Sequence, residues 1–332
     1  MELFVTGAAG FLGNAIVRSL RSHGHEAVGL GITDQDLRKV ERAGGRPVQG
    51  DLRTKEGLET AARGAREADG VIHAIKISHR AAPGVVETDV AKRQVLNLKA
   101  LEDWESVDRN SVSAMLDALA GSGKPFVYSS SCAIFGNTGT AVFNEDSQVP
   151  AESVYGTWRA KHDRMLREAS SRGIRTVVLR SAMIYGPHPD GMPLGRPDPA
   201  NMHQQLMDKD AVGYLGKGDE ISTCVHVDDY ADLFVLALEK AQPGSVFIAG
   251  SEDYSRKTLA LALSHAYGYR GKTRSWTLEE AHAVLGKGKI LDFLFENHRT
   301  TSDKAKRVLG WEPTRPSLLE FALQEAKRAT RP

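Results

Sequence analysis

The sequence predicts an α/β protein built on a doubly wound parallel sheet. Near its start, the apolar stretch Leu3–Val5 passes through the turn Thr6–Gly13 directly into an amphipathic segment, Phe11–Ser22. A second apolar stretch, Ala27–Leu30, follows the glycine stop at Gly24. A strand, a glycine-rich turn, a helix and a second strand in this order form a βαβ unit, and further strand and helix patterns follow along the chain.

The turn itself predicts a site for the pyrophosphate of a dinucleotide. Gly7 permits the tight turn, Gly10 lets a bound group approach the backbone, and Gly13 lets the helix pack closely on its strand. The free N–H groups and the positive dipole end of that helix favour phosphate. The spacing differs from GxGxxG, and taken alone it is also compatible with an ordinary glycine-rich turn.

Composition limits the class of protein. A chain of 332 residues with 41% hydrophobic residues can bury a sizeable core, as one large domain or two closely packed ones. The 43 basic and 42 acidic residues leave no basic excess for nucleic acid or anionic lipid. Cys132 and Cys224 are too few for a disulfide framework, no leader precedes the first strand, and no apolar run approaches the roughly 20 residues that span a bilayer. A cytoplasmic protein with reduced thiols is expected.

The residue that ends the second strand bears on the choice of cofactor. Rossmann-type sites usually place Asp or Glu there, where the carboxylate accepts a hydrogen bond from the ribose 2′-OH. Here the position is Gly31, and Thr33, Arg38 and Lys39 follow it. The site is therefore predicted to favour NADP, whose 2′-phosphate these residues can meet, with NAD as the alternative because two aspartates lie near.

The next segments continue the alternation. Strands are predicted at Pro47–Gln49, Gly70–Ile75 and Phe126–Tyr128, and helices at Lys55–Arg66 and Asp108–Ala120. His73 lies in a run that is apolar on both sides, so it is predicted to be a core histidine with satisfied polar atoms. Residues 76–103 have a weak pattern, compatible with a helix near Asp89–Leu98 and with a substrate or cofactor loop.

Polar residues gather where the strand around Phe126–Tyr128 ends, at Ser129–Gly136. Ligands of open parallel sheets bind beyond the carboxyl ends of strands, so we expect chemistry here. Tyr155 then opens a long helix, with Arg159 four and Lys161 six residues later. On a helix, Arg159 lies about 40° and Lys161 about 240° around the axis from Tyr155. Arg159 therefore shares the face of Tyr155.

These features resemble those of an extended, and here atypical, short-chain dehydrogenase/reductase of the NAD-dependent epimerase/dehydratase superfamily. The resemblance covers almost the whole chain through Thr6–Gly13, Gly50–Leu52, Val71–Ala74, Phe126–Gly136, Tyr155 with its helix, Arg180–Pro187, Val225–Asp229 and Leu309–Pro313. It implies a Rossmann-type dinucleotide-binding domain in residues 1–180. It also implies a smaller mixed substrate lobe in residues 181–332, from which a strand near 246–250 returns to the sheet.

The resemblance also assigns site residues. Tyr155 would exchange the proton of the reacting oxygen and Ser131 would hydrogen-bond that oxygen, while Arg159 occupies the position of the family's lysine. At ~4 Å and an effective dielectric near 20, a positive charge favours a Tyr155 phenolate by about 4 kcal/mol, but a guanidinium cannot relay a proton. The alternative is an exposed helix charge in a site with altered or lost redox chemistry. The predicted cofactor contacts are Gly7, Gly10, Phe11, Leu12, Gly13, Thr33, Arg38, Asp51, Leu52, Ala74, Ile75, Ser129, Tyr155, Arg159 and Ala182.

Departures from the family pattern limit the range of expected substrates. Family dehydratases carry Asp-Glu where this chain has Cys132-Ala133, which argues against a sugar dehydratase. Met183 stands where an asparagine contacts the diphosphate of nucleotide sugars, which argues against that substrate class. The stretch His188–Pro199 is rich in proline and glycine, and it is either a lid over the substrate or a surface connection.

The C-terminal half is predicted to build the smaller lobe. Helices are expected near Met202–Met207, Tyr230–Lys240, Thr258–Tyr267, Leu278–Leu285 and Leu318–Arg328, with strand segments at Gly213–Gly218 and Phe247–Ala249. His226 and Asp229 are expected to support the fold rather than to react. Trp276, Trp311 and Phe293–Phe295 are expected to fill core or subunit contacts, and no metal-ligand spacing is present.

The favoured function is hydride transfer between NADP(H) and a carbonyl or secondary alcohol of a small or medium-sized organic molecule. An epimerase with tightly bound NAD, acting on a sugar or nucleotide sugar, is the alternative. A dinucleotide-binding sensor is a second alternative, although such a protein would need neither Ser131 nor Tyr155. A homodimer with a small-molecule substrate is expected, without nucleic acid, membrane or metal.

Overall fold

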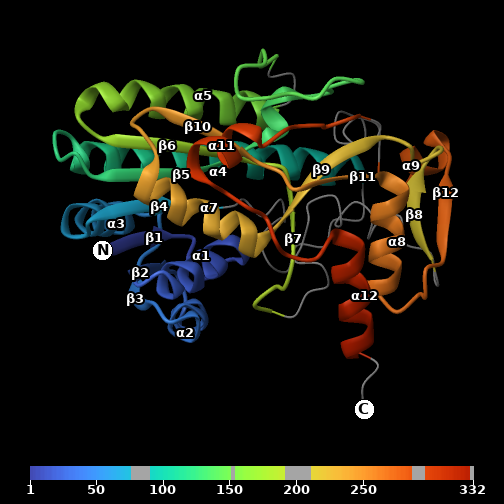
Figure 1. Cartoon of the computed structure of the whole chain (residues 1–332), viewed down its shortest axis with the longest axis horizontal. Coiled ribbons are helices and arrows are strands. Elements are labelled where there is room, and N and C mark those ends of the chain that lie inside the picture. Colours follow the sequence, from blue (N-terminus) through green and yellow to red (C-terminus); the bar gives the residue numbers. More distant parts are fainter. Residues whose placement is uncertain (76–89, 151–153, 191–210, 286–295, 330–332) are drawn as a thin grey trace.

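A seven-stranded sheet forms the centre of the protein (Figure 1). The computed structural model describes residues 1–75, 90–150, 154–190, 211–285 and 296–329. All neighbouring strands of this sheet are parallel, in the order β10-β6-β5-β4-β1-β2-β3. They are β1 Glu2–Thr6, β2 Glu26–Gly31, β3 Arg46–Gln49, β4 Gly70–His73, β5 Pro125–Ser131, β6 Arg175–Ser181 and β10 Ser245–Ala249. The order reverses between β1 and β4, the position where open sheets bind ligands. The predicted doubly wound α/β fold is confirmed.

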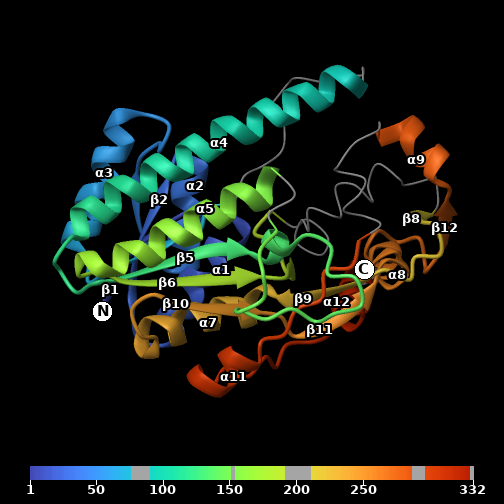
Figure 2. The ribbon, with the colours of Figure 1, turned by 90° about the horizontal axis from the view of Figure 1, so that it is seen from above.

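Helices cover both faces of the sheet, because successive residues of its strands point to opposite faces. On the face of Leu3 and Val5 lie α1 Phe11–Ser22, α2 Asp34–Ala43, α7 Val227–Lys240 and α11 Asp303–Leu309. On the face of Phe4 lie α3 Lys55–Glu67, α4 Val90–Leu119 and α5 Val154–Ala169. Figure 2 shows α4 and α5 lying side by side along the sheet.

The smaller mixed lobe lies beyond the carboxyl ends of the central strands (Figures 1 and 2). Strands β7 Met183–Tyr185 and β9 Ile221–His226 are parallel, and β11 Glu252–Ser255 is antiparallel to β9. Strands β8 Val212–Leu215 and β12 Thr273–Trp276 form a second small sheet. The helices of this lobe are α8 Arg256–Ala266, α9 Leu278–Leu285 and α12 Leu318–Ala329. A separate buried cluster that includes Tyr185, Leu259 and Phe321 forms its core.

Strand β10 returns to the edge of the large sheet beside β6, as predicted for residues 246–250. The chain therefore enters the smaller lobe after β6 and returns to the large sheet at β10, before the C-terminus. The division of the chain at residue 180 stays a prediction.

The main difference from the predicted elements is α4. A helix was predicted at Asp108–Ala120, and residues 76–103 were compatible with a further helix near Asp89–Leu98 or with a loop, but α4 is one helix of 30 residues. No glycine or proline occurs between Val90 and Leu119, so nothing in the backbone chemistry interrupts it. Helix α2 was not predicted, although Thr33 and Asp36 form a capping box at its start.

Some of the predicted features lie in the described residues and can be compared with the structure, whereas others lie outside them. Trp311 is buried and its indole N–H donates to the Asp229 carbonyl oxygen at 2.8 Å, which confirms a core role. The predicted helix Met202–Met207, the run Phe293–Phe295 and residues 191–199 lie outside the described residues. Among the helices that the structure describes, none is long and apolar enough to cross a membrane.

Candidate cofactor-binding and catalytic site

The turn after β1 has the close packing that its glycines predict. Gly7 has a φ of +71°, in the left-handed region, and a Cβ atom there would lie 2.5 Å from the carbonyl oxygen of Ala74. A Cβ atom on Gly13 would overlap the carbonyl oxygen of Gly7. The turn, the start of α1 and the end of β4 are therefore in direct contact, and Ile75 is the next residue of the chain. The structure thus brings these predicted cofactor residues together at the switch point.

Gly10 leaves open space at the N-terminus of α1. Its φ of −79° is accessible to any residue, and the only atom that a Cβ would meet within 4 Å is the Gly7 carbonyl oxygen, at 3.2 Å. The Gly10 N–H donates to that oxygen, which fixes the turn. Phe11 and Leu12 follow as the first residues of α1, whose first turn contains no carboxylate. These features fit a pyrophosphate group.

At the end of β2, packing against α2 itself requires a small residue. A Cβ on Gly31 would lie 3.0 Å from Asp36 Cβ and 3.1 Å from a methyl of Leu37. Thr33 begins α2, where its hydroxyl accepts from the Asp36 N–H and the Asp36 carboxylate accepts from the Thr33 N–H. Arg38 is exposed. The absence of a carboxylate at position 31 therefore has a structural reason, independent of which dinucleotide binds.

Residues 186–190, which follow β7, fold back over this part of the sheet. The His188 ring stacks on Phe11 with 5.4 Å between ring centroids and 22° between planes. The Asp190 carboxylate lies 2.8 Å from Lys39 Nζ on α2. The segment thus connects the smaller lobe to the glycine turn and to the end of β2. Lys39, which the sequence offered to a 2′-phosphate, is paired with Asp190 in the protein.

Other predicted cofactor residues have structural partners as well. Arg53 donates to both carboxylate oxygens of Asp51, and this hydrogen bonding holds the pKa of Asp51 below its ordinary value. Leu52 is buried among the residues that cover the Phe4 face. The Ala182 N–H donates to the Ala249 carbonyl oxygen at 2.9 Å. Their cofactor contacts stay predictions.

Strand β5 runs on through Ser131, past the predicted end at Tyr128, and its serines alternate between the faces of the sheet. The Ser129 hydroxyl lies 3.4 Å from the Tyr230 hydroxyl on α7, whereas the Ser130 hydroxyl donates to Asp163 on α5 at 2.6 Å. The Ser131 hydroxyl accepts from the Ala133 N–H at 3.2 Å, at the start of the short 3₁₀ helix Cys132–Phe135. Ser131 therefore stands at the carboxyl end of β5.

Arg159 is buried in α5, whereas Lys161 is exposed, as the helical geometry predicts. Arg159 Nη1 donates to the Tyr128 hydroxyl at 2.5 Å and to the Ser129 carbonyl oxygen at 3.1 Å. It lies 3.4 Å from a carboxylate oxygen of Asp108. Only 3% of Arg159 is exposed, so the alternative of an exposed helix charge is wrong. The side chain of Tyr155 lies outside the described residues, and the grouping of Ser131, Tyr155 and Arg159 stays a prediction.

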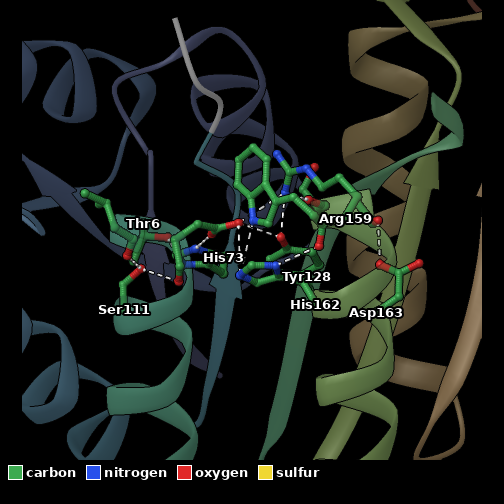
Figure 3. Close-up of polar contacts among 12 residues, drawn as sticks. Thr6, His73, Ser111, Tyr128, Arg159, His162 and Asp163 are labelled. Carbon is green, nitrogen blue, oxygen red and sulfur yellow. Dashed lines mark hydrogen bonds and ion pairs between the residues drawn. The ribbon is translucent and has the colours of Figure 1, made fainter. Parts of the chain in front are cut away.

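Asp108 joins Arg159 to a buried polar cluster at the carboxyl ends of β1 and β4 and the middle of β5 (Figure 3). One Asp108 oxygen lies 2.7 Å from His73 Nε2, and the other accepts from the Tyr128 hydroxyl at 2.7 Å. His73 Nδ1 lies 2.7 Å from the Thr6 hydroxyl. Both ring nitrogens of His73 are thus hydrogen-bonded, which confirms a satisfied core histidine. We call the set of Thr6, His73, Asp108, Tyr128, Arg159 and His162 the Asp108 cluster.

The protonation states of this cluster follow from its burial and partners. Burial raises the pKa of Asp108, but the His73 hydrogen bond and the charges of His73, Arg159 and His162 outweigh it and lower the pKa to about 2. Burial lowers the pKa of His162, whose Nε2 accepts from the Trp158 indole N–H at 3.3 Å. Burial raises the pKa of Tyr128, so Tyr128 stays a neutral donor. Asp108 and Arg159 therefore form a buried ion pair.

Asp108 gives the fold a defined pH dependence. Its pKa falls from 3.8 to about 2 on folding, so it contributes stability above about pH 4 that is lost as the pH falls toward 2. The shift corresponds to about 2 kcal/mol. We expect the stability difference between the protein and Asp108→Asn to shrink as the pH falls from about 4 toward 2. Urea unfolding across this range tests it, and a difference that grows in acid contradicts it.

A second buried pair holds the same part of β5. The Asp163 carboxylate accepts from Ser130 at 2.6 Å and from Arg180 Nε of β6 at 2.8 Å. Asp163 lies one helical turn after Arg159 on α5. The two pairs therefore fasten α5 to successive residues of β5, directly before Ser131.

The positions that depart from the family pattern have apolar or weakly polar surroundings. Burial raises the pKa of the Cys132 thiol to about 12, and its sulfur contacts the Arg180 carbonyl oxygen at 3.5 Å. Ala133 has no ionisable group. Met183 of β7 accepts a contact from the Tyr254 hydroxyl at 3.0 Å. Cys132 and Ala133 therefore cannot serve as the acid and base of a dehydration at neutral pH.

His226 and Asp229 support the fold, as predicted. The His226 ring accepts from the Asp228 N–H and caps α7. The Asp229 carboxylate accepts from the N–H groups of Thr314 and Arg315, which anchors the C-terminal segment. In the parts of the chain with described side chains, no group of His, Cys, Asp and Glu could hold a metal ion.

Sequence reasoning missed Asp108, Tyr128, His162 and Asp163. Tyr128, His162 and Asp163 lie in stretches that carry the resemblance, but nothing in the sequence singled out the individual residues. The one available signal was the helical spacing that places Asp108 and Asp163 on the same helix faces as the buried residues Val112 and Leu166. A buried carboxylate needs a partner, although no such partner was predicted from the sequence.

Comparison with known proteins decides the family. The profile of the NAD dependent epimerase/dehydratase family matches residues 3–250, which is most of the chain. The chain belongs to this family. As a member of the NAD dependent epimerase/dehydratase family, it is an enzyme of the NAD(P)-dependent short-chain dehydrogenase/reductase type, as the resemblance implied.

Relatives within the family align over nearly the full length. An uncharacterised protein of Schizosaccharomyces pombe is 29% identical over 98% of this chain and 99% of its own length. A UDP-glucose 4-epimerase of Azospirillum brasilense is 26% identical over 94% of this chain and 87% of its own. The structure of UDP-glucose 4-epimerase from Thermotoga maritima, solved with UDP-glucose, has a TM-score of 0.74 at 20% identity and covers all of both chains. That structural likeness supports the fold alone.

Proposed function

We propose that the protein is an epimerase that takes a hydride from a secondary alcohol and returns it to the opposite face of the same carbon, with a dinucleotide that stays bound between turnovers. The observation that carries this proposal is the contact of residues 186–190 with the pyrophosphate and adenosine parts of the predicted dinucleotide site. His188 covers Phe11 beside the glycine turn, and Asp190 binds Lys39 on α2. An enzyme that reuses its cofactor gains from such a closure, because release is not part of its cycle.

The proposal assigns a separate role in the reaction to each residue of the site. In the proposal, the turn Gly7–Gly13 holds the pyrophosphate, and the bound nicotinamide supplies the hydride acceptor. Tyr155 accepts the proton of the substrate hydroxyl, and Ser131 hydrogen-bonds the same oxygen. Arg159 favours the ionised form of Tyr155 and orients the nicotinamide ribose. Because Arg159 cannot deprotonate, the proton stays on Tyr155 until the hydride returns, which suits an epimerase.

The proposed substrate class follows from the positions at which the chain differs from the family pattern. Cys132 and Ala133 lack dehydration chemistry, so the proposal is hydride transfer without loss of water. Met183 is engaged by Tyr254 and lacks the amide that would hold a sugar diphosphate. We therefore propose a sugar or another hydroxylated compound, with the nucleotide-sugar form as a less supported member of that class. A cytoplasmic homodimer is also part of the proposal.

A second candidate is an oxidoreductase that exchanges NADP(H) with solution, and Gly31 is the observation that favours it. Without a carboxylate at position 31, one negative charge that would repel a 2′-phosphate is missing, although Asp36 packs beside Gly31. Lys39 would have to leave Asp190 to bind it. The two candidates therefore predict opposite behaviour of the 186–190 segment.

One experiment separates the candidates. We expect the purified protein, after gel filtration without added cofactor, to release about one NAD per chain on denaturation. We also expect Asp190→Asn with His188→Ala to lose most of it, because the stacking on Phe11 and the ion pair with Lys39 are removed. Glu41→Gln, an exposed change on α2, is the matched control. Protein free of dinucleotide that binds NADPH about tenfold more tightly than NADH, a difference of about 1.4 kcal/mol, would instead establish the second candidate.

A further inference from the structure

The Asp108 cluster carries an inference that rests on the proposed function. We propose that Asp108 is a positioning residue that acts through Arg159. Its carboxylate fixes the Arg159 guanidinium beside Tyr128 and Ser129 of β5, and so sets how Arg159 meets the nicotinamide ribose. Asp108 itself is fully buried on α4 and contacts the cofactor in no step of the proposal.

The geometry makes Asp108 part of the anchor of Arg159. Arginine has a long side chain whose rotamers must be fixed before it can orient a ligand. Nη1 is bound on one side by the Ser129 carbonyl oxygen, which belongs to the sheet, and on the other by Tyr128 and Asp108. The Trp158 ring lies 4.5 Å from the guanidinium carbon. The guanidinium is therefore held by groups from α4, α5 and β5 together.

The anchor is itself rigid. His73 of β4 holds one carboxylate oxygen of Asp108, and Tyr128 of β5 holds the other. His73 is held in turn by Thr6, the residue before Gly7. Figure 3 shows Thr6, His73, Tyr128 and Arg159 converging from neighbouring strands and helices. A continuous chain of contacts thus runs from the glycine turn to Arg159.

The charge of Asp108 also changes what Arg159 offers to the site. A buried guanidinium is costly unless a counter-ion and hydrogen bonds compensate it. The carboxylate at 3.4 Å provides that compensation. The positive charge that Tyr155 and the ribose meet is therefore already paired. A lone cation at the same place would act more strongly, and its effect on Tyr155 would be larger than in this protein.

Two nucleotides distinguish positioning from a general effect on folding. NADH reaches both the glycine turn and the nicotinamide end, whereas ADP reaches only the adenosine and pyrophosphate part. In protein stripped of bound dinucleotide, we expect Asp108→Asn to weaken NADH binding about tenfold and to leave ADP binding within about twofold. Calorimetric or fluorescence titration measures both.

Matched variants show whether the effect passes through Arg159. Asp163→Asn removes the other buried carboxylate of α5, and we expect it to lower stability without changing the ratio of NADH to ADP affinity. Arg159→Gln should weaken NADH about as much as Asp108→Asn. The double variant Asp108→Asn/Arg159→Gln should be no weaker than Arg159→Gln alone, because the shared interaction is already gone. That variant also removes both charges, which avoids an unpaired buried ion.

Three results would overturn the positioning role and leave the proposed function intact. They are unchanged NADH affinity in Asp108→Asn, a loss of ADP affinity equal to the loss of NADH affinity, and additive losses in the double variant. A parent protein that binds neither NADH nor ADP would overturn the proposed function, and this inference with it.

Discussion

Gly10→Val is expected to weaken binding of every nicotinamide dinucleotide by at least about a hundredfold, or about 2.7 kcal/mol. The backbone at Gly10 accepts valine, since its φ is −79° and a Cβ would meet only the Gly7 carbonyl oxygen, at 3.2 Å. The side chain would instead fill the space that a pyrophosphate needs above the start of α1. Titration with NAD, NADH, NADP and NADPH, together with the dinucleotide content after purification, measures the loss.

A contrast within the same turn separates binding from folding. Gly10→Val should unfold close to the temperature of the parent, because its φ suits valine and its Cβ meets one atom, the Gly7 carbonyl oxygen at 3.2 Å. Gly13→Ala places its Cβ on the Gly7 carbonyl oxygen, so it should lower the unfolding temperature as well as binding. Tight dinucleotide binding by folded Gly10→Val would mean that the cofactor lies elsewhere.

The glycine turn was predictable because its requirements are local. The close approach of Gly13 to Gly7 lies within one turn, and the positive φ of Gly7 is a property of that turn, although Gly7 also packs on Ala74 from a distant strand end. The helical repeat likewise placed Arg159 and Lys161 on different faces of α5, but it did not say which face is buried. The glycine turn indicated the fold class, and the spacing of Arg159 and Lys161 indicated that they lie on different faces of α5.

The Asp108 cluster was not predictable because its contacts are distant in sequence. Five of its residues come from five different elements, and only the completed sheet brings them together. They are Thr6 of β1, His73 of β4, Asp108 of α4, Tyr128 of β5 and Arg159 of α5. The predicted helix began at Asp108, so the buried face of α4 on which Asp108 lies was not recognised. The estimate of about 4 kcal/mol for Arg159 acting on Tyr155 treated the guanidinium as a lone charge. Asp108 at 3.4 Å makes that figure an upper bound.

Tyr155→Phe is expected to lower turnover by about 10²- to 10⁴-fold, because it removes the group that exchanges the proton. Arg159→Ala should also lower turnover strongly, and Lys161→Ala should leave it nearly unchanged because Lys161 is exposed on the outer side of α5. Arg159→Ala additionally leaves Asp108 buried without its guanidinium partner, at a cost of about 3–5 kcal/mol in stability. Turnover must therefore be compared per folded protein, with unfolding measured in parallel.

Arg159→Lys separates the catalytic contribution of the cation from its structural one. Lysine keeps a positive charge near Asp108 and is the family's own residue at this position, but it cannot reproduce the guanidinium geometry at Tyr128 and Ser129. Near-normal turnover in this variant would show that the site needs a cation there, and that the arginine geometry serves mainly the fold. Turnover as low as in Arg159→Ala, with stability retained, would show that the guanidinium geometry itself is required. If Tyr155→Phe keeps full activity on the true substrate, another group exchanges the proton, and Ser131, Tyr155 and Arg159 do not form one catalytic unit.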